Sequence, residues 1–175
     1  SNRFSKKSVD IRFYCAKALI SKGNASQGLK FLEDIPVSYH RLEYYVLRAT
    51  GFLYAGKANF CADEMKKAQS KITENTSQHF RDLINVTEAR CYVEQQKYSL
   101  ALQRFQNIRV NSDFYLETLE EQAWVQFKMR NLTSSRELLN IIISNISSQN
   151  SEQSDKTNIY FRVRYLQGYI DLISK

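Results

Sequence analysis

The sequence contains little proline, little glycine and no long apolar run. One proline and five glycines occur among 175 residues, which leaves few of the turns that an all-β fold requires. No window approaches about 18 uninterrupted apolar residues, so no membrane span is expected. Hydrophobic residues make up 43% and charged residues 25% of the chain, as in ordinary globular domains. Together these counts favour an all-α fold.

Cysteine and histidine are also scarce. Cys15, Cys61 and Cys91 are too few and too scattered for a disulfide framework, and their odd number favours reduced thiols and hence the cytoplasm. The only histidines, His40 and His79, are not placed to form a catalytic or metal-binding cluster. No zinc-ligand spacing or dinucleotide-binding glycine pattern occurs. We therefore expect no enzyme, no cofactor and no metal site.

Positive charge is concentrated at one end of the chain. The net charge is +7, and residues 1–30 contain seven Lys and Arg side chains against Asp10 alone. A basic end can contact the phosphates of nucleic acid, but no RNA-binding aromatic signature accompanies it. We take residues 1–8 as a solvated basic segment, with nucleic-acid binding as a disfavoured alternative.

Small residues recur along the chain at intervals near 34 residues, and a fixed pattern follows most of them. Ala16, Ala49, Ala89, Ala123 and Gly168 are 33, 40, 34 and 45 residues apart. After each of the first four come a break, a second small residue, a large apolar residue and a further apolar residue. The breaks are Gly23, Gly56, Gln96 and Arg130, and the second small residues are Gly28, Cys61, Ala101 and Ser135. The large apolar residues are Leu32, Met65, Phe105 and Leu139. The further residues are Ile35, Ala68, Ile108 and Ile142. Antiparallel helices approach closely where small side chains face each other, so the pattern predicts helix pairs.

The pattern also predicts where the helices lie. They are expected near residues 8–22, 25–35, 40–55, 58–72, 79–95, 98–108, 113–129, 132–146 and 158–174. The polar tract 144–157 accounts for the longest spacing and is expected to be a flexible surface loop. A single repeat domain is thus expected over residues 9–175.

These features resemble the tetratricopeptide repeat, a helix–turn–helix unit of roughly 34 residues. The clearest stretch is Gln95–Phe105, which looks like the turn and second helix of that family. The family's usual tryptophan and closing proline are missing. The resemblance implies a right-handed α-solenoid of about four repeats and a final helix. It also implies a scaffold that binds proteins or peptides, and one short stretch, residues 122–127, is similar to repeats of bacterial cell-envelope proteins.

In that family the first helix of each pair lines a concave groove, and the resemblance carries this role over to particular positions. The groove residues are then Phe13, Lys17, Val46, Thr50, Leu53, Val86, Arg90, Glu117, Glu120, Trp124 and Phe127. Another groove-lining position holds Asp10, Glu43, Leu83, Glu117 and Arg162. The Lys and Asn clamp by which one subclass of the family grips a peptide's C-terminal carboxylate is therefore absent. The groove is otherwise apolar, with acidic groups at Glu117 and Glu120 near the fourth repeat, and such a surface suits a partner segment with apolar anchors and a basic residue. Trp124 and Phe127 can serve either the groove or the core.

Two further alternatives remain open. The chain could be the peptide-sensing regulatory domain of a larger protein, which would require an effector domain elsewhere. Tyr160, Phe161, Tyr165 and Tyr169 would leave an apolar face on the last helix, which favours a homodimer or a longer repeat array.

Overall fold

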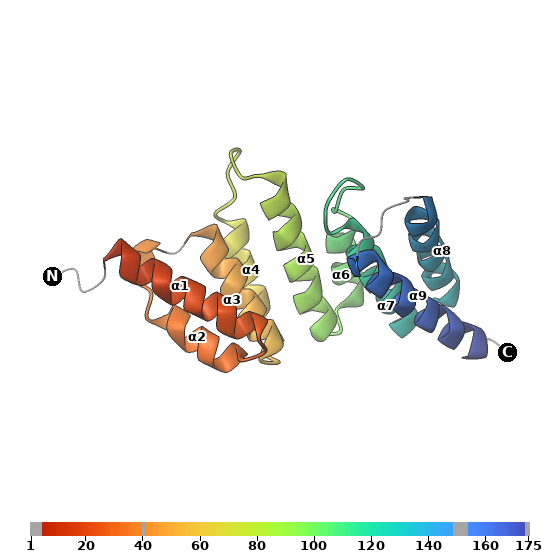
Figure 1. Ribbon diagram of the computed structural model, residues 1–175, viewed down its shortest axis with the longest axis horizontal. Coiled ribbons are helices and arrows are strands. Elements are labelled where there is room, and N and C mark those ends of the chain that lie inside the picture. The colour runs from red at the N-terminus through yellow and green to blue at the C-terminus, as the bar shows by residue number, and fades with distance from the viewer. Residues whose placement is uncertain (1–4, 40, 149–153, 174–175) are drawn as a thin grey trace. The chain divides into compact units, whose positions relative to one another are not determined.

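The computed structural model describes residues 5–39, 41–148 and 154–173, and within these ranges it contains helices and turns but no strand (Figure 1). The all-α prediction is confirmed. No helix in the described part is long and apolar enough to cross a membrane. The helices are α1 (Lys6–Ser21), α2 (Ala25–Glu33), the short 3-10 helix η1 (Val37–Tyr39), α3 (Leu42–Tyr54), α4 (Ala58–Gln69), α5 (Gln78–Glu94), α6 (Tyr98–Phe105), α7 (Tyr115–Lys128), α8 (Leu132–Ser148) and α9 (Ser154–Ile173).

The chain divides into two compact units, residues 1–97 and 98–175. In the first unit α1 packs on α2, α3 packs on α4, and α4 packs on α5 around a core that includes Ile20, Leu32 and Met65. In the second unit α7 packs on α8, and α8 on α9, around Leu139 and Leu166. The continuity of one repeat domain over residues 9–175 stays a prediction.

The four predicted breaks are confirmed as the turns that end α1, α3, α5 and α7. Gly23, Gly56, Gln96 and Arg130 have φ values of 85°, 69°, 58° and 64°, in the left-handed region. At every one of these turns the following amide N–H donates to the carbonyl five residues earlier, as in a Schellman motif. These bonds join Asn24 to Leu19, Lys57 to Phe52, Lys97 to Tyr92 and Asn131 to Gln126, at 2.8–2.9 Å. Four breaks chosen by spacing thus share one backbone conformation.

The small residues lie where neighbouring helices touch. A Cβ atom on Gly28 would lie 2.6 Å from Ile20 Cγ1 and 2.9 Å from the carbonyl oxygen of Ala16, so α1 and α2 can approach this closely only with glycine there. At the corresponding contact between α7 and α8, the Ser135 hydroxyl donates to the Ala123 carbonyl at 2.9 Å. The first small residue of each of the four pairs is fully buried: Ala16, Ala49, Ala89 and Ala123.

The fifth small residue does not follow this rule. Gly168 on α9 is exposed, and a Cβ atom added there would meet nothing within 4 Å. Its expected role as a close helix contact is wrong, because α9 buries Val163, Leu166 and Ile170 instead. The position was assigned from its place in the series, although no break or second helix followed it.

The predicted loop at 144–157 is mostly helical. Residues 144–148 continue α8 and residues 154–157 begin α9, while 149–153 lie outside the described residues. The Ser144 hydroxyl donates to the Asn140 carbonyl at 2.9 Å, and the Asn145 amide donates to Ile141 at 2.8 Å. Polar side chains that bond back to the preceding turn are compatible with a helix, and Ile146 packs against the second core. Polarity alone therefore gave the wrong prediction here.

The basic N-terminal segment also ends earlier than expected. The Ser5 hydroxyl accepts the Ser8 amide N–H at 3.2 Å and caps α1, so Lys6–Ser8 belong to the helix. Residues 1–4 lie outside the described part of the chain. The other predicted helices occur at their predicted places, with ends shifted by a few residues.

Candidate interaction site

A pocket of about 170 Å³ opens between the start of α1, the segment after α2, and the first turn of α3. Val9, Ile35 and Tyr44 line it and are buried. Phe13 and Tyr39 also line it and are partly buried. We refer to the three buried residues as the floor of the pocket and to Phe13 and Tyr39 as its walls. The interior is thus mostly apolar and aromatic.

The remaining lining residues are exposed and form the rim of the pocket. They are Asp10 and Tyr14 of α1, Arg41 at the N-cap of α3, and Glu43 in the first turn of α3. Tyr14 is 66% exposed. Neither the Asp10 nor the Glu43 carboxylate makes an ion pair with another residue in the described ranges. The rim therefore carries two negative charges and one positive charge.

Tyr44 connects the pocket to the interior of the first unit. Its hydroxyl donates to the Leu32 carbonyl at 3.2 Å, and Arg48 Nη1 donates to the Tyr44 hydroxyl at 3.4 Å. Burial raises the pKa of the Tyr44 phenol above its ordinary value, and the Arg48 guanidinium opposes part of this rise. Because the hydroxyl is bonded within the fold, the floor does not require a polar ligand.

The predicted groove residues of the first unit differ in accessibility. Val46 is 7% exposed and Val86 is 0% exposed, so both pack inside the protein and cannot contact a partner in this conformation. Lys17 is exposed, and the Thr50 hydroxyl donates to the Val46 carbonyl at 2.9 Å. The partly buried members of the set are Phe13, Thr50, Leu53 and Arg90. Of these residues, Phe13 lines the pocket.

In the second unit the Glu120 carboxylate is already paired. Arg162 Nε and Nη2 of α9 donate to its two oxygens at 2.7 and 2.6 Å. The Glu120 side chain is 7% exposed, and its hydrogen bonds raise the pKa of the Arg162 guanidinium. The basic residue that we expected a partner to supply for Glu120 is thus supplied by the chain itself, whereas Glu117 remains partly exposed.

Trp124 and Phe127 extend the second core towards α9. Their ring centroids lie 5.9 Å apart at 89°, and Phe127 meets Tyr169 of α9 edge-on at 5.6 Å. Both residues are partly buried and pack against the second core. The sequence left open whether these two residues line the groove or pack in the core, and the contacts seen here are core packing contacts.

The apolar face expected on the last helix is present on α9. Phe161, Tyr165 and Leu172 are exposed, and Tyr169 is exposed apart from its contact with Phe127. Association into a homodimer or a longer array stays a prediction.

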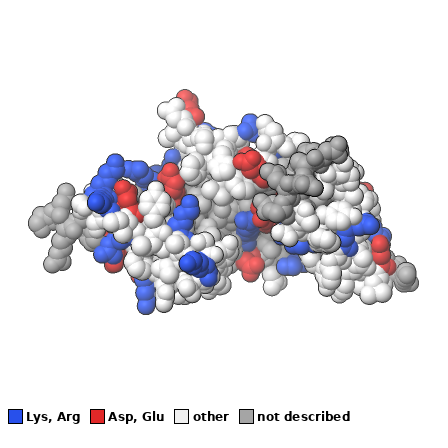
Figure 2. All heavy atoms as spheres, viewed as in Figure 1, with Lys and Arg blue, Asp and Glu red and all other residues white. Residues whose placement is uncertain are grey.

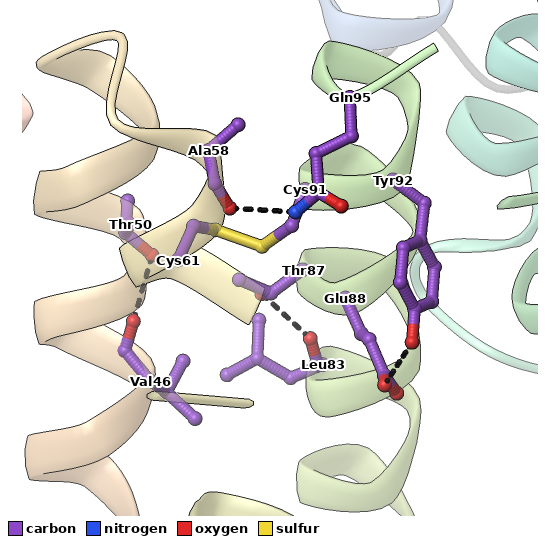
Figure 3. The surroundings of a disulfide bond; sticks show 10 residues. All are labelled: Val46, Thr50, Ala58, Cys61, Leu83, Thr87, Glu88, Cys91, Tyr92 and Gln95. Atoms are coloured by element: carbon purple, nitrogen blue, oxygen red, sulfur yellow. Dashed lines mark hydrogen bonds between the residues drawn. A yellow bond between two sulfur atoms is a disulfide. The ribbon is translucent and has the colours of Figure 1, made fainter. Parts of the chain in front are cut away.

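Two of the three cysteines form a disulfide, which corrects the expectation of reduced thiols. Cys61 of α4 and Cys91 of α5 have Cα atoms 5.8 Å apart, and both are fully buried (Figure 3). The Gln95 side chain also joins these two helices by donating to the Ala58 carbonyl at 2.9 Å. Cys15 is free and exposed. The preference for the cytoplasm rested on reduced thiols and loses that basis.

The basic end of the chain is interrupted by acidic groups. Lys6, Lys7 and Lys17 are exposed, whereas Arg12 Nη1 pairs with Asp34 Oδ2 at 2.6 Å. Figure 2 shows acidic side chains among the Lys and Arg side chains around the N-terminal helices. This face is therefore not a uniformly basic surface for phosphates.

Sequence reasoning found only part of the pocket. Phe13 was expected in the groove, and Asp10 and Glu43 were assigned to a groove-lining position that lacks a carboxylate clamp, but Tyr39 and Arg41 had not been considered. The latter two lie in and after the irregular segment that follows α2, where helical periodicity carries no information. The only proline, Pro36, marks that segment as irregular and was the available signal.

Within the described ranges, no group of three His, Cys, Asp or Glu residues could hold a metal ion. His79 is exposed, and His40 lies outside the described residues. The chain matches no protein-family model, no curated protein and no solved structure. The absence of enzymatic activity and the tetratricopeptide resemblance both stay predictions.

Proposed function

We propose that the chain is a non-enzymatic helical-repeat scaffold, similar to tetratricopeptide arrays, that binds a segment of a partner protein. Two regularities support this proposal. The same left-handed turn ends α1, α3, α5 and α7, and small buried residues recur at corresponding places in the helix pairs. Stacking of successive pairs into a right-handed α-solenoid is part of the proposal.

The observation that carries the proposal is the pocket between α1 and α3. Three of its lining residues, Asp10, Phe13 and Glu43, occupy positions that line the peptide groove in tetratricopeptide proteins. Phe13 is one of the groove residues that the resemblance implies, and Asp10 and Glu43 share a groove-lining position that lacks the Lys and Asn of a carboxylate clamp; all three line this cavity. Binding sites are commonly concave and lined mainly by apolar and aromatic side chains with a few polar groups, and peptides often dock apolar anchor side chains into such sites.

Selection from a random peptide library tests this function directly. The full, oxidised chain is immobilised and exposed to phage-displayed 12-residue peptides of roughly random sequence, and enriched peptides are synthesised for calorimetric titration. We expect peptides that bind in the micromolar range, as single-segment anchors often do, and that compete with one another for one site. Failure to enrich any competing peptides would contradict the proposed function.

Nucleic acid is the rival partner suggested by the basic end, and it has its own probe. Random-sequence single-stranded RNA should bind weakly, because Arg12 is paired with Asp34 and other acidic groups interrupt the basic residues. Fluorescence anisotropy at increasing salt separates the two partners. Tight RNA binding that weakens steeply with salt would favour the nucleic-acid alternative.

A further inference from the structure

The pocket between α1 and α3 combines an apolar interior with a charged rim. From this arrangement we infer that it receives one aliphatic or aromatic side chain of a partner peptide, while Asp10 and Glu43 bind a Lys or Arg next to that anchor. The inference rests on the proposed function and specifies the peptide chemistry that the pocket selects.

The size of the cavity favours a single side chain. Its volume is about 170 Å³, whereas pockets for drug-sized molecules usually measure about 300–1,000 Å³. A whole cofactor or metabolite of ordinary size would not be enclosed. One large side chain of a peptide would fill the space, and the rest of the peptide would lie across the rim.

The floor determines that this side chain is apolar. Val9 and Ile35 offer no polar side-chain atom, and the Tyr44 hydroxyl already bonds to the Leu32 carbonyl. A polar side chain inserted here would lose its water without gaining a partner from these floor residues, which is costly. An apolar side chain would instead be removed from water against Phe13.

The rim determines the charge of the neighbouring residue. Asp10 and Glu43 are exposed carboxylates from α1 and α3 on the same pocket, and neither is paired within the described ranges. A Lys or Arg beside the anchor can therefore meet two carboxylates. Arg41 is the third charged group at the rim and would repel a cation, so its removal should improve binding of the same peptide. This opposite effect distinguishes charge recognition from general damage to the pocket.

The test uses peptides enriched on the wild-type chain, each with two analogues. In one analogue the basic residue becomes Gln, and in the other the apolar anchor becomes Ala. The affinities of each enriched peptide and of its two analogues are measured for three proteins: the wild type, Asp10→Asn/Glu43→Gln and Arg41→Ala. The matched control is Glu74→Gln/Glu94→Gln, which removes the same charge from exposed and unpaired side chains of the first unit.

We expect Asp10→Asn/Glu43→Gln to weaken the basic peptide by about three- to ten-fold, since exposed ion pairs contribute modestly. The Gln analogue should bind the wild type and this variant equally. Arg41→Ala should strengthen the basic peptide by about two- to three-fold, and the control should leave its affinity unchanged.

Four outcomes would overturn the inference. The first is that enriched peptides lack the apolar–basic pair, and the second is that they bind Asp10→Asn/Glu43→Gln as tightly as wild type. Either result leaves the scaffold function standing and refutes the pocket chemistry. Failure to enrich any peptide refutes both. Tyr14→Ser is a second rim variant that should fold normally, because the side chain is 66% exposed; unchanged affinity in this variant would place the peptide elsewhere. The peptide analogues keep the test decisive even if a protein variant fails to fold.

Discussion

The disulfide between α4 and α5 should contribute a large part of the stability of the first unit. Cys61 and Cys91 are separated by 30 residues. The chain-entropy relation for a loop of this length gives a loss of about 3.6 kcal/mol in the free energy of unfolding when the bond is reduced. This is a substantial fraction of the stability of a typical domain, which is about 5–15 kcal/mol.

Reduction of the bond tests this value more cleanly than mutation does. A reducing agent breaks the cross-link and leaves both sulfur atoms in place, whereas Cys61→Ala/Cys91→Ala also removes buried atoms and should therefore cost more. Urea unfolding of the oxidised and reduced protein, followed by far-ultraviolet circular dichroism, gives the difference. With a slope of about 1–3 kcal/mol per molar urea, the midpoint should fall by about 1–4 M.

Two results would refute this reasoning. One is an equal urea midpoint for oxidised and reduced protein. The other comes from alkylation of the oxidised protein after it is unfolded without reductant. We expect modification of Cys15 alone. Modification of all three cysteines would show that the bond is not formed. Cys15→Ser is the matched control, because this exposed thiol should not affect stability.

Three further predictions follow from contacts within each unit. Gly28→Ala should destabilise the protein by about 1–3 kcal/mol through overpacking. Gly168→Ala should instead stabilise it by about 0.5–1 kcal/mol, because alanine has the higher helix propensity and its Cβ meets no clash there. Thermal unfolding midpoints that shifted in the same direction for both variants would contradict this. Arg162→Ala should cost about 1–3 kcal/mol because it leaves the Glu120 carboxylate buried and unpaired, and adding Glu120→Gln should recover part of that loss in a double-mutant cycle. Since the folded-state pKa of Tyr44 lies above its unfolded value near 10.0, its neutral form contributes stability that is fully present below pH 10 and lost as the pH rises further; urea midpoints above pH 10 should fall less steeply for Tyr44→Phe than for wild type.

The repeated turns could be predicted because they depend on local spacing. Gln96 and Arg130 are not typical residues for a left-handed conformation, yet their positions relative to Ala89 and Ala123 identified them as helix ends. Close packing of a helix pair constrains sequence within a few tens of residues, so one chain is enough to reveal it.

The disulfide and the pairing of Glu120 could not be predicted in the same way. Cys61 occupies a slot where any small residue fits, and its bond to Cys91 depends on how α4 faces α5. Glu120 and Arg162 are 42 residues apart and meet only because α9 packs against α7 and α8. The pocket shows a similar division: the helical spacing placed Phe13, but the path of the chain around Tyr39 followed no period.

The cross-link between α4 and α5 also limits how far the chain can be stretched. A force that pulls on the two ends of the chain would be carried by the disulfide between Cys61 and Cys91. The 30-residue segment that this bond closes into a ring would therefore not be extended. At about 3.3–3.6 Å per residue, that ring withholds about 100 Å of extension. Most of α4, its connection to α5 and most of α5 lie inside the ring. If the protein links two partners under tension, its maximum length therefore depends on whether its surroundings are oxidising or reducing.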